Sequence, residues 1–358
     1  MKIFIDIGHP AHVHYFRNFM SIMNEKGHTF FITARDKEVV FDLLNHYNLE
    51  YRSRGKGSNG IVGKLLYIAK ADRTLLKFAK QFKPDLFLSF ASPYAAQASR
   101  LLGKPHIAFD DTDHAIFSHA MYVPFTRSIA TPKVYLKDYG KKHIRFNAFM
   151  EMCSLLPKYF IEDGSILTNA GIAENERYAI VRFVSWQASH DIGEKGLSLE
   201  GKIEIVKALS QQGRVIISSE GTVPKELEPF VFKSHPAHMH QFLKSASLIV
   251  SESLTMAAEA AFLGTPAICI STAKAGTLDE EVRLGLIELY RNPNGLTNRA
   301  VKLFKDIGYK EQFKAQLNRV LADLIDPTAF MVWFVENYPN SASIIKENPE
   351  YQNRFKIR

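Results

Sequence analysis

Residues 248–270 read Leu248-Ile-Val-Ser-Glu-Ser-Leu-Thr-Met-Ala-Ala-Glu-Ala-Ala-Phe-Leu-Gly-Thr-Pro-Ala-Ile-Cys-Ile270 and contain the pattern that decides the fold. Two short apolar runs, Leu248–Val250 and Ala267–Ile270, have the length and branched side chains of buried β-strands. Between them, a polar turn leads into an alanine-rich helical segment that begins near Thr255 and ends before Gly264. Strand, helix and strand in this order predict a parallel βαβ unit.

The same alternation extends along most of the 358 residues. The other predicted strands are Lys2–Ile7, His28–Thr33, Leu49–Tyr51, Leu86–Phe90, His106–Phe109, Tyr178–Phe183, Val215–Ser218 and Val231–Phe232. The predicted helices include Val13–Glu25, Lys37–His46, Val62–Phe82, Ala95–Leu102, Leu199–Gln211 and Met239–Ser245. The less regular segment Tyr139–Pro157 is expected to be a linker. We therefore predict two Rossmann-like α/β domains, residues 1–155 and 156–325, followed by a helical segment, residues 326–358.

Composition excludes several classes of protein. Hydrophobic residues make up 46% and charged residues 23% of the chain, as in ordinary globular proteins. Two cysteines, Cys153 and Cys269, are too few for a disulfide framework or a cysteine zinc site. The chain starts with Met1–Asp6, whose acidic end does not fit a signal peptide, and no apolar run approaches the roughly 18 residues of a membrane span. We expect a cytoplasmic protein and leave open a peripheral contact with the inner face of the membrane.

The net charge of +8 is spread along the chain. It favours a phosphate-bearing small molecule over nucleic acid, because no RNA-binding motif or recognition-helix pattern accompanies it.

The segment from Ser251 to Ile268 resembles the donor-site signature of GT-B-fold proteins, especially UDP-N-acetylglucosamine 2-epimerases and related glycosyltransferases. More narrowly, the chain resembles an uncharacterised GT-B-like family found near polysaccharide-synthesis genes, in which Thr-Met-x-x-Glu-Ala-Ala precedes Leu-Gly-Thr-Pro. The resemblance implies two facing domains with a nucleotide sugar in the cleft between them. It also implies an acceptor side on the first domain, a donor side on the second, and C-terminal helices that cross back to the first.

The predicted donor site begins where the helix after Val250 starts. Unsatisfied backbone N–H groups at a helix N-terminus favour a diphosphate. Ser253 and Thr255 either bind phosphate oxygens or simply cap the helix, and Met256 follows them in the motif. The resemblance implies that Glu259 reaches into the cleft and binds the ribose hydroxyls; the alternative is a structural carboxylate.

The sequence also departs from the epimerases. They place two glycines where this chain has Leu254-Thr255. Their catalytic aspartate falls near Ala91-Ser92 here, and their next acidic residue falls at Asp110. These differences favour transfer over epimerisation.

Histidines follow the first predicted strand in Gly8-His-Pro-Ala-His-Val-His14. Such a turn lies at the carboxyl edge of a parallel sheet, where ligands bind. Gly8 is expected to contact substrate, and His9 or His12 to act as a general base. The alternatives are a metal site, or one helix cap with surface histidines. A similar stretch, His235–His240, is interpreted as a coincidence.

Other polar side chains follow predicted strands. Asp110 or Asp111, after the fifth strand, is a candidate base, with loop capping as the alternative. Arg182, Ser219 and Glu220 are predicted substrate contacts on the donor side. Ser185 and His190 lie nearby, but no role is assigned to them. The basic segment Arg52–Gly60 either closes over a substrate or is a surface loop.

These patterns predict a glycosyltransferase-like enzyme of surface polysaccharide or glycoconjugate synthesis. Its donor is a nucleotide sugar, most simply UDP-linked, and its acceptor a sugar or a lipid-linked sugar. Neither a metal nor another cofactor is expected. The alternatives are a 2-epimerase-like enzyme and a non-catalytic nucleotide-sugar-binding protein.

Overall fold

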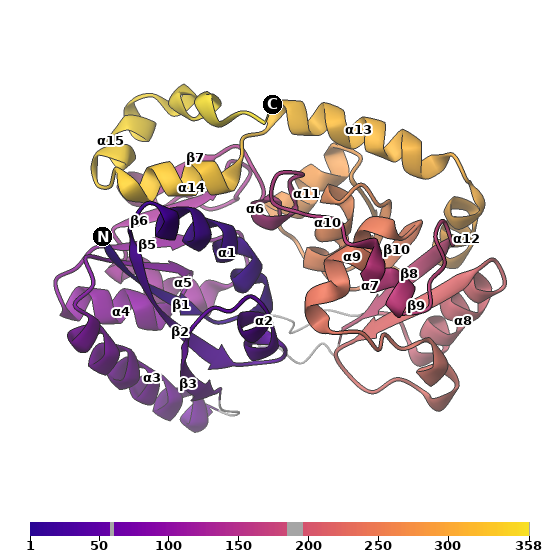
Figure 1. Ribbon diagram of the computed structural model, residues 1–358, viewed down its shortest axis with the longest axis horizontal. Helices are drawn as coiled ribbons and strands as arrows, with labels where there is room; N and C mark the ends of the chain where they lie inside the picture. The colour runs from indigo at the N-terminus through magenta and orange to yellow at the C-terminus, as the bar shows by residue number, and fades with distance from the viewer. Residues whose placement is uncertain (58–60, 185–195, 358) are drawn as a thin grey trace. The chain divides into compact units, whose positions relative to one another are not determined.

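The computed structural model describes residues 1–57, 61–184 and 196–357. They form two compact units, each built around one parallel β-sheet (Figure 1). The first unit contains Met1–Ser154 and Leu324–Arg358, and the second contains Leu155–Asp323. The predicted α/β fold with two Rossmann-like domains is confirmed.

The first sheet has seven strands in the order β3-β2-β1-β4-β5-β6-β7. They are β1 (Lys2–Ile7), β2 (Thr29–Asp36), β3 (Arg52–Lys56), β4 (Leu86–Phe90), β5 (His106–Phe109), β6 (Ser128–Pro132) and β7 (His143–Phe146). All pairings are parallel. The strand order reverses between β1 and β4, and in such sheets ligands bind at the carboxyl ends of the strands beside this switch point.

Helices cover both faces of the first sheet, so its central strands are buried on both sides and consist of continuous apolar runs. The helices are α1 (Pro10–Glu25), α2 (Val40–His46), α3 (Ile61–Phe82), α4 (Pro93–Leu101) and α5 (Ile116–Tyr122), with short 3₁₀ turns η1 (Val123–Phe125) and η2 (Gly140–Lys142). One core joins Phe4 of β1 and Phe87 of β4 to α3 and α4 through Leu75, Ala79 and Ala95.

The C-terminal segment completes the first unit. Helices α14 (Pro327–Glu336) and α15 (Asn340–Glu347) precede the 3₁₀ turns η5 (Pro349–Phe355), and α14 packs against α1 (Figure 1). Asp326 caps α14 by accepting a hydrogen bond from the Ala329 N–H, and the Phe330 ring stacks 5.5 Å from that of Phe146. Among the described helices, none is long and apolar enough to cross a membrane.

The second sheet has five parallel strands in the order β12-β11-β10-β8-β9. They are β8 (Tyr178–Phe183), β9 (Arg214–Ser219), β10 (Leu248–Ser251), β11 (Ala267–Ile270) and β12 (Ile287–Tyr290). The helices of this part of the chain are α6 (Met152–Leu155), α7 (Gly164–Asn169), α8 (Leu199–Ser210), α9 (Met239–Ser245), α10 (Leu254–Phe262), α11 (Gly276–Arg283), α12 (Leu296–Lys305) and α13 (Tyr309–Asp323). The order of this sheet reverses between β8 and β10.

Several strands differ from the sequence prediction. The third strand is Arg52–Lys56, within the expected basic loop, and not Leu49–Tyr51. The sequence of this strand is polar, and its buried arginine, Arg54, pairs with the buried carboxylate of Asp6. The segment Tyr139–Pro157, predicted to be a linker, contains the boundary between the two units after Ser154, but it also contains β7, which pairs with the unpredicted β6. Val231–Phe232 forms only an isolated bridge to Ile217, and β12 was not predicted.

Candidate functional site

The start of α10 lies at the carboxyl end of β10 and carries three of the predicted donor-site residues. Ser253 caps the helix: its Oγ accepts the Met256 N–H at 3.3 Å. The Ser251 hydroxyl fixes the turn, since it accepts the Ser253 N–H at 2.9 Å and donates to the Ser253 carbonyl at 2.7 Å. Ser253, Thr255 and Met256 are partly exposed, so an anion has access to the first turn of α10.

Glu259 lies further along α10 and is less open than predicted. Its side chain does not reach into open solvent: the residue is only 8% exposed. His240, on the neighbouring helix α9, places its Nε2 3.3 Å from Glu259 Oε1. The packing of α9 on α10 therefore covers one carboxylate oxygen, and a ligand would have to use the other, Oε2.

Two further predicted contacts meet at the carboxyl ends of β8 and β9. Arg182 donates through Nη1 to Ser218 Oγ at 2.8 Å and through Nη2 to Glu220 Oε1 at 2.5 Å. The Ser219 hydroxyl donates to the Gly221 carbonyl at 2.9 Å. Because β8 lies between β9 and β10, these side chains share one sheet edge with the start of α10.

Sequence reasoning missed Glu252 at this edge. Its buried carboxylate accepts the backbone N–H groups of Val184 (2.8 Å) and Leu197 (2.7 Å), and Lys202 Nζ lies 3.3 Å away. Glu252 therefore holds the backbone on both sides of residues 185–195. The two residues of that segment considered from the sequence, Ser185 and His190, lie outside the described part of the chain.

The histidine turn of the first unit follows β1. His9 caps α1, since its Nδ1 accepts the Ala11 N–H at 3.3 Å. His12 Nδ1 accepts the Gly8 N–H, also at 3.3 Å. Burial, with the positive neighbours His9, Lys37 and Arg54, holds the pKa of His12 well below its ordinary value. A neutral imidazole that accepts at Nδ1 carries its proton on Nε2, so His12 is arranged as a hydrogen-bond donor and not as a base.

The two histidine stretches have the same local geometry. His235 caps its short helix η4 (Pro236–His238) as His9 caps α1, by accepting the Ala237 N–H at 3.2 Å. Capping, one of the readings of the sequence, is therefore observed in both copies. Within residues 1–57, 61–184 and 196–357, no three His, Cys, Asp or Glu side chains are grouped to hold a metal ion.

A buried ion pair lies beneath the histidine turn, and sequence reasoning also missed it. Asp6, at the end of β1, is fully buried and accepts from Arg54 Nε (2.8 Å), Thr33 Oγ1 (2.8 Å) and Ser92 Oγ (2.5 Å). Ser92 stands near the place of the epimerase aspartate. A Cβ added at Gly8 would lie 3.4 Å from Arg54 Nη2, so the Arg54 guanidinium lies close to this turn.

Tyrosines surround the guanidinium of Arg54. It lies 4.5 Å from the ring centre of Tyr94 and donates to the Tyr67 hydroxyl. The contacts with the two tyrosines and with the Asp6 carboxylate together compensate for the hydration that the Arg54 guanidinium loses on burial. Of the basic segment Arg52–Gly60, residues 58–60 lie outside the described part of the chain.

The two candidate aspartates after β5 have different surroundings. Asp110 is fully buried and accepts from the Tyr122 hydroxyl (2.6 Å), the Tyr135 hydroxyl (3.1 Å) and the Thr112 N–H (3.0 Å). Its acceptor capacity is used inside the protein, which fits a structural role. Asp111 is partly exposed, and desolvation together with the charge of Asp110 raises the pKa of Asp111 to about 7. Asp111 therefore suits a general base better than Asp110 does.

The sequence model of the family described as "Protein of unknown function (DUF354)" matches residues 1–338. The chain belongs to the DUF354 family. An uncharacterized protein of Methanocaldococcus jannaschii is 25% identical to it over 190 residues, which cover 51% of this chain and 56% of that relative. The aligned region thus spans little more than half the length of the curated relative.

Solved structures share the fold of this DUF354 protein. MnaA of S. aureus, solved with UDP, is 12% identical at a TM-score of 0.69, over 95% of this chain and 97% of that one. The UDP-GlcNAc 2-epimerase of Neisseria meningitidis, bound to UDP-GlcNAc, is 12% identical at a TM-score of 0.62, over 97% and 99%. The spinosyn rhamnosyltransferase SpnG is 12% identical at a TM-score of 0.57, over 94% and 100%. The GT-B fold is thereby established for the DUF354 chain.

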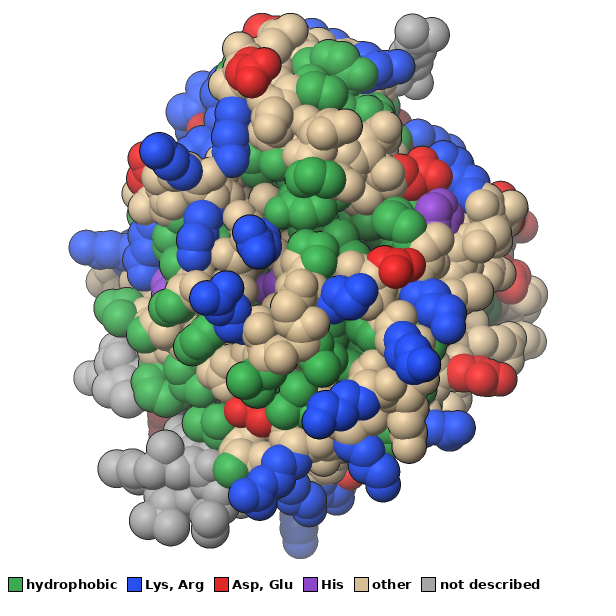
Figure 2. Space-filling model, turned by 90° about the vertical axis from the view of Figure 1, so that its left-hand side faces the viewer, with side chains coloured by type: hydrophobic (Ala, Val, Ile, Leu, Met, Phe, Trp, Pro, Cys, Tyr) green, Lys and Arg blue, Asp and Glu red, His purple; other side chains and the backbone are tan. Residues whose placement is uncertain are grey.

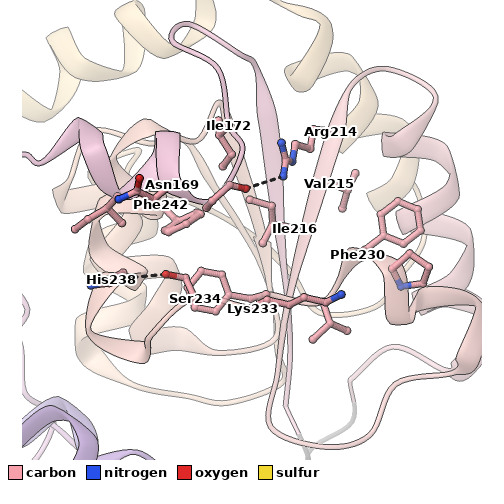
Figure 3. A pocket seen from close by; sticks show the side chains of 15 residues that line it. Asn169, Ile172, Arg214, Val215, Ile216, Phe230, Lys233, Ser234, His238 and Phe242 are labelled. Carbon is pink, nitrogen blue, oxygen red and sulfur yellow. Dashed lines mark hydrogen bonds between the residues drawn. The ribbon is translucent and has the colours of Figure 1, made fainter. Parts of the chain in front are cut away.

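The DUF354 protein also has a cavity away from these sheet edges. It has a volume of about 520 Å³ and lies beside the first half of β9, where Arg214 and Ile216 line it together with Phe230, His238 and Phe242 (Figure 3). Arg214 Nη1 donates a hydrogen bond to the Gly171 carbonyl at 2.5 Å. None of the residues predicted from the sequence to bind the nucleotide sugar lines this cavity.

Proposed function

We propose that this DUF354 protein is a glycosyltransferase-like enzyme that uses a nucleotide sugar, most simply UDP-linked, in the synthesis of a surface polysaccharide or glycoconjugate. The observation that carries the proposal is the carboxyl edge of the second sheet. Arg182 lies at the carboxyl end of β8, and the partly exposed first turn of α10 and Glu259 belong to the helix that follows the neighbouring strand β10. They offer N–H groups and a cation for phosphate, and an acceptor for hydroxyl groups.

On this proposal the first turn of α10 stabilises the departing nucleoside diphosphate. Backbone N–H groups and the helix dipole act there without a metal ion. Ser253 has its oxygen committed to the cap, so Thr255 supplies the side-chain hydroxyl for phosphate. Glu259 accepts from the ribose through the oxygen that His240 does not cover.

The acceptor, a sugar or a lipid-linked sugar, belongs to the first unit in this proposal. Asp111 removes the proton from the acceptor hydroxyl, because its pKa of about 7 lets it take up and release a proton near neutral pH. His9 and His12 donate hydrogen bonds from Nε2 and orient the acceptor. The Asp6–Arg54 pair lies next to the turn that carries both histidines.

Binding of nucleoside diphosphates tests the donor side. Titration calorimetry with UDP, GDP, CDP and dTDP identifies the nucleotide that the parent protein prefers. Thr255→Asp should then weaken its binding at least about tenfold, because the new carboxylate repels the diphosphate. Asn298→Asp adds the same charge to the exposed first turn of α12 and should leave the affinity unchanged. A parent that binds none of the four, or a Thr255→Asp protein that binds as well as the parent, contradicts the proposal.

Product analysis tests the reaction. A transferase releases the nucleoside diphosphate and forms a glycoside only when an acceptor is present. Interconversion of sugar epimers without an acceptor would identify an epimerase instead, and tight binding without turnover across an acceptor panel would identify a binding protein.

A further inference from the structure

Exposed cations collect at the amino-terminal edge of the first sheet, opposite the edge of the histidine turn. Lys83 precedes β4, Lys104 precedes β5, Arg127 precedes β6 and Lys141 precedes β7, and all four are exposed. Parallel strands begin at the same edge, so the loops that lead into these four consecutive strands are neighbours. Among the residues that the structure describes, none of the four has a carboxylate within 4.0 Å.

Two carboxylates near this edge have partners inside the protein. Asp85 accepts the backbone N–H of Lys2 at 2.8 Å. Glu336 lies 2.5 Å from Lys26 and 3.1 Å from His28. In the loops that lead into β4, β5, β6 and β7, the cations outnumber the two carboxylates, Asp85 and Asp138, so an external anion would be attracted to this region.

Lys142 lies near other cations of this edge and fixes the position of η1. Its Nζ donates to the Val123 carbonyl at 2.9 Å and to the Pro124 carbonyl at 3.3 Å, which anchors η1. Partial burial and the nearby charges of Arg100 and Arg127 lower the pKa of Lys142. Three like charges thus crowd one place, and a bound anion would relieve their repulsion.

Two large hydrophobic side chains stand among these cations. Leu101, next to Arg100 at the end of α4, is 69% exposed, and Phe125, two residues before Arg127, is 37% exposed. Helix α4, which ends at Leu101, packs against η1, which contains Phe125. On the face shown in Figure 2, Lys and Arg side chains lie among hydrophobic ones, and Asp and Glu side chains are fewer.

We propose that this basic edge, defined by Lys83, Arg100, Lys104, Arg127 and Lys141 with Leu101 and Phe125, binds the surface of an anionic lipid bilayer. The cations would bind lipid phosphates, and the leucine and phenylalanine would insert between headgroups. The exposed apolar pair favours a bilayer over a nucleic acid, whose phosphate backbone offers it no apolar surface. The proposal is independent of the proposed reaction, because it uses no residue of either candidate site.

Co-sedimentation with lipid vesicles tests the proposal on the full chain. The parent should bind vesicles of equimolar phosphatidylcholine and phosphatidylglycerol, should release them as salt is raised, and should not bind phosphatidylcholine alone. Lys104→Glu with Arg127→Glu should weaken binding at least about tenfold. The matched control, Lys302→Glu with Arg319→Glu, makes the same charge change at exposed positions of α12 and α13 and should bind like the parent.

The apolar contribution is tested separately. Leu101→Ser should weaken vesicle binding several-fold without changing the thermal melt, whereas Ile307→Ser, at a side chain 79% exposed in the second unit, should not. The proposal would be overturned if the edge variant and the control variant lost vesicle binding equally. It would also be overturned if the parent bound neutral vesicles as well as anionic ones, or bound neither. The proposal would also be overturned if Lys104→Glu with Arg127→Glu weakened the binding of a short DNA duplex but left vesicle binding unchanged.

Discussion

Replacing Arg54 by methionine should strongly destabilise the first unit. Arg54 and Asp6 are 3% and 0% exposed at the side chain, so removal of the guanidinium leaves a carboxylate in the interior with only the Thr33 and Ser92 hydroxyls as partners. Breaking a buried ion pair from one side costs about 3–5 kcal/mol. For a unit of this size, about 2–4 °C of melting temperature corresponds to each kcal/mol. We therefore expect a fall of about 6–20 °C.

The matched variant is Asp6→Asn combined with Arg54→Met, which removes both charges and keeps two side chains of similar volume. It should recover most of the lost melting temperature, because no unpaired charge stays buried. Thermal melts followed by circular dichroism, with Arg52→Met as a control at an exposed position of the same strand, provide the measurement. An Arg54→Met protein that melts within about 2 °C of the parent would refute the reasoning, and so would a double variant no more stable than Arg54→Met alone.

Three further predictions concern the candidate sites. Glu259→Ala should weaken binding of the preferred nucleotide about ten- to a hundredfold, since hydrogen bonds to charged groups contribute about 1.5–3 kcal/mol; unchanged affinity with a lower melting temperature, as expected for a partner of His240 only, would contradict this role. Asp111→Asn should lower kcat about a hundredfold or more. The activity of the parent should rise with pH through about 7, because only the ionised Asp111 carboxylate accepts a proton, and a flat pH profile would contradict the assignment. Asp110→Asn should mainly lower the melting temperature. Nucleotide affinity measured by calorimetry should be the same with and without EDTA; loss that a divalent ion restores would show that a metal takes part.

The buried strands of both sheets could be predicted because burial on two faces demands continuous apolar runs. Lys2–Ile7, His106–Phe109 and Tyr178–Phe183 were predicted with the bounds that the structure has. Strands with polar residues among the apolar ones could not be found this way. β3 contains Arg-Ser-Arg-Gly-Lys, and its buried Arg54 pairs with Asp6, a partner 48 residues away. β7 reads His-Ile-Arg-Phe and is not a continuous apolar run.

Local geometry at the candidate site was easier to predict than long-range contacts. The cap at Ser253 follows from a serine before a helical run, and the structure contains it. The contact of Glu259 with His240 depends on two helices meeting, and no local pattern encodes it. A clue to the Asp6–Arg54 pair was present, since a carboxylate inside an apolar strand requires a partner, but the sequence does not say which cation supplies it.

The return of α14 to the first unit has a consequence for the order of folding. Phe330 and Phe334 of α14 are fully buried, and the Ile325 N–H donates to the Asn147 carbonyl at 3.0 Å. During synthesis, residues 1–154 leave the ribosome long before these partners exist, whereas Leu155–Asp323 form an uninterrupted stretch. The second unit can therefore close while translation continues, and the first must wait, with part of its core uncovered, for the final helices of the chain.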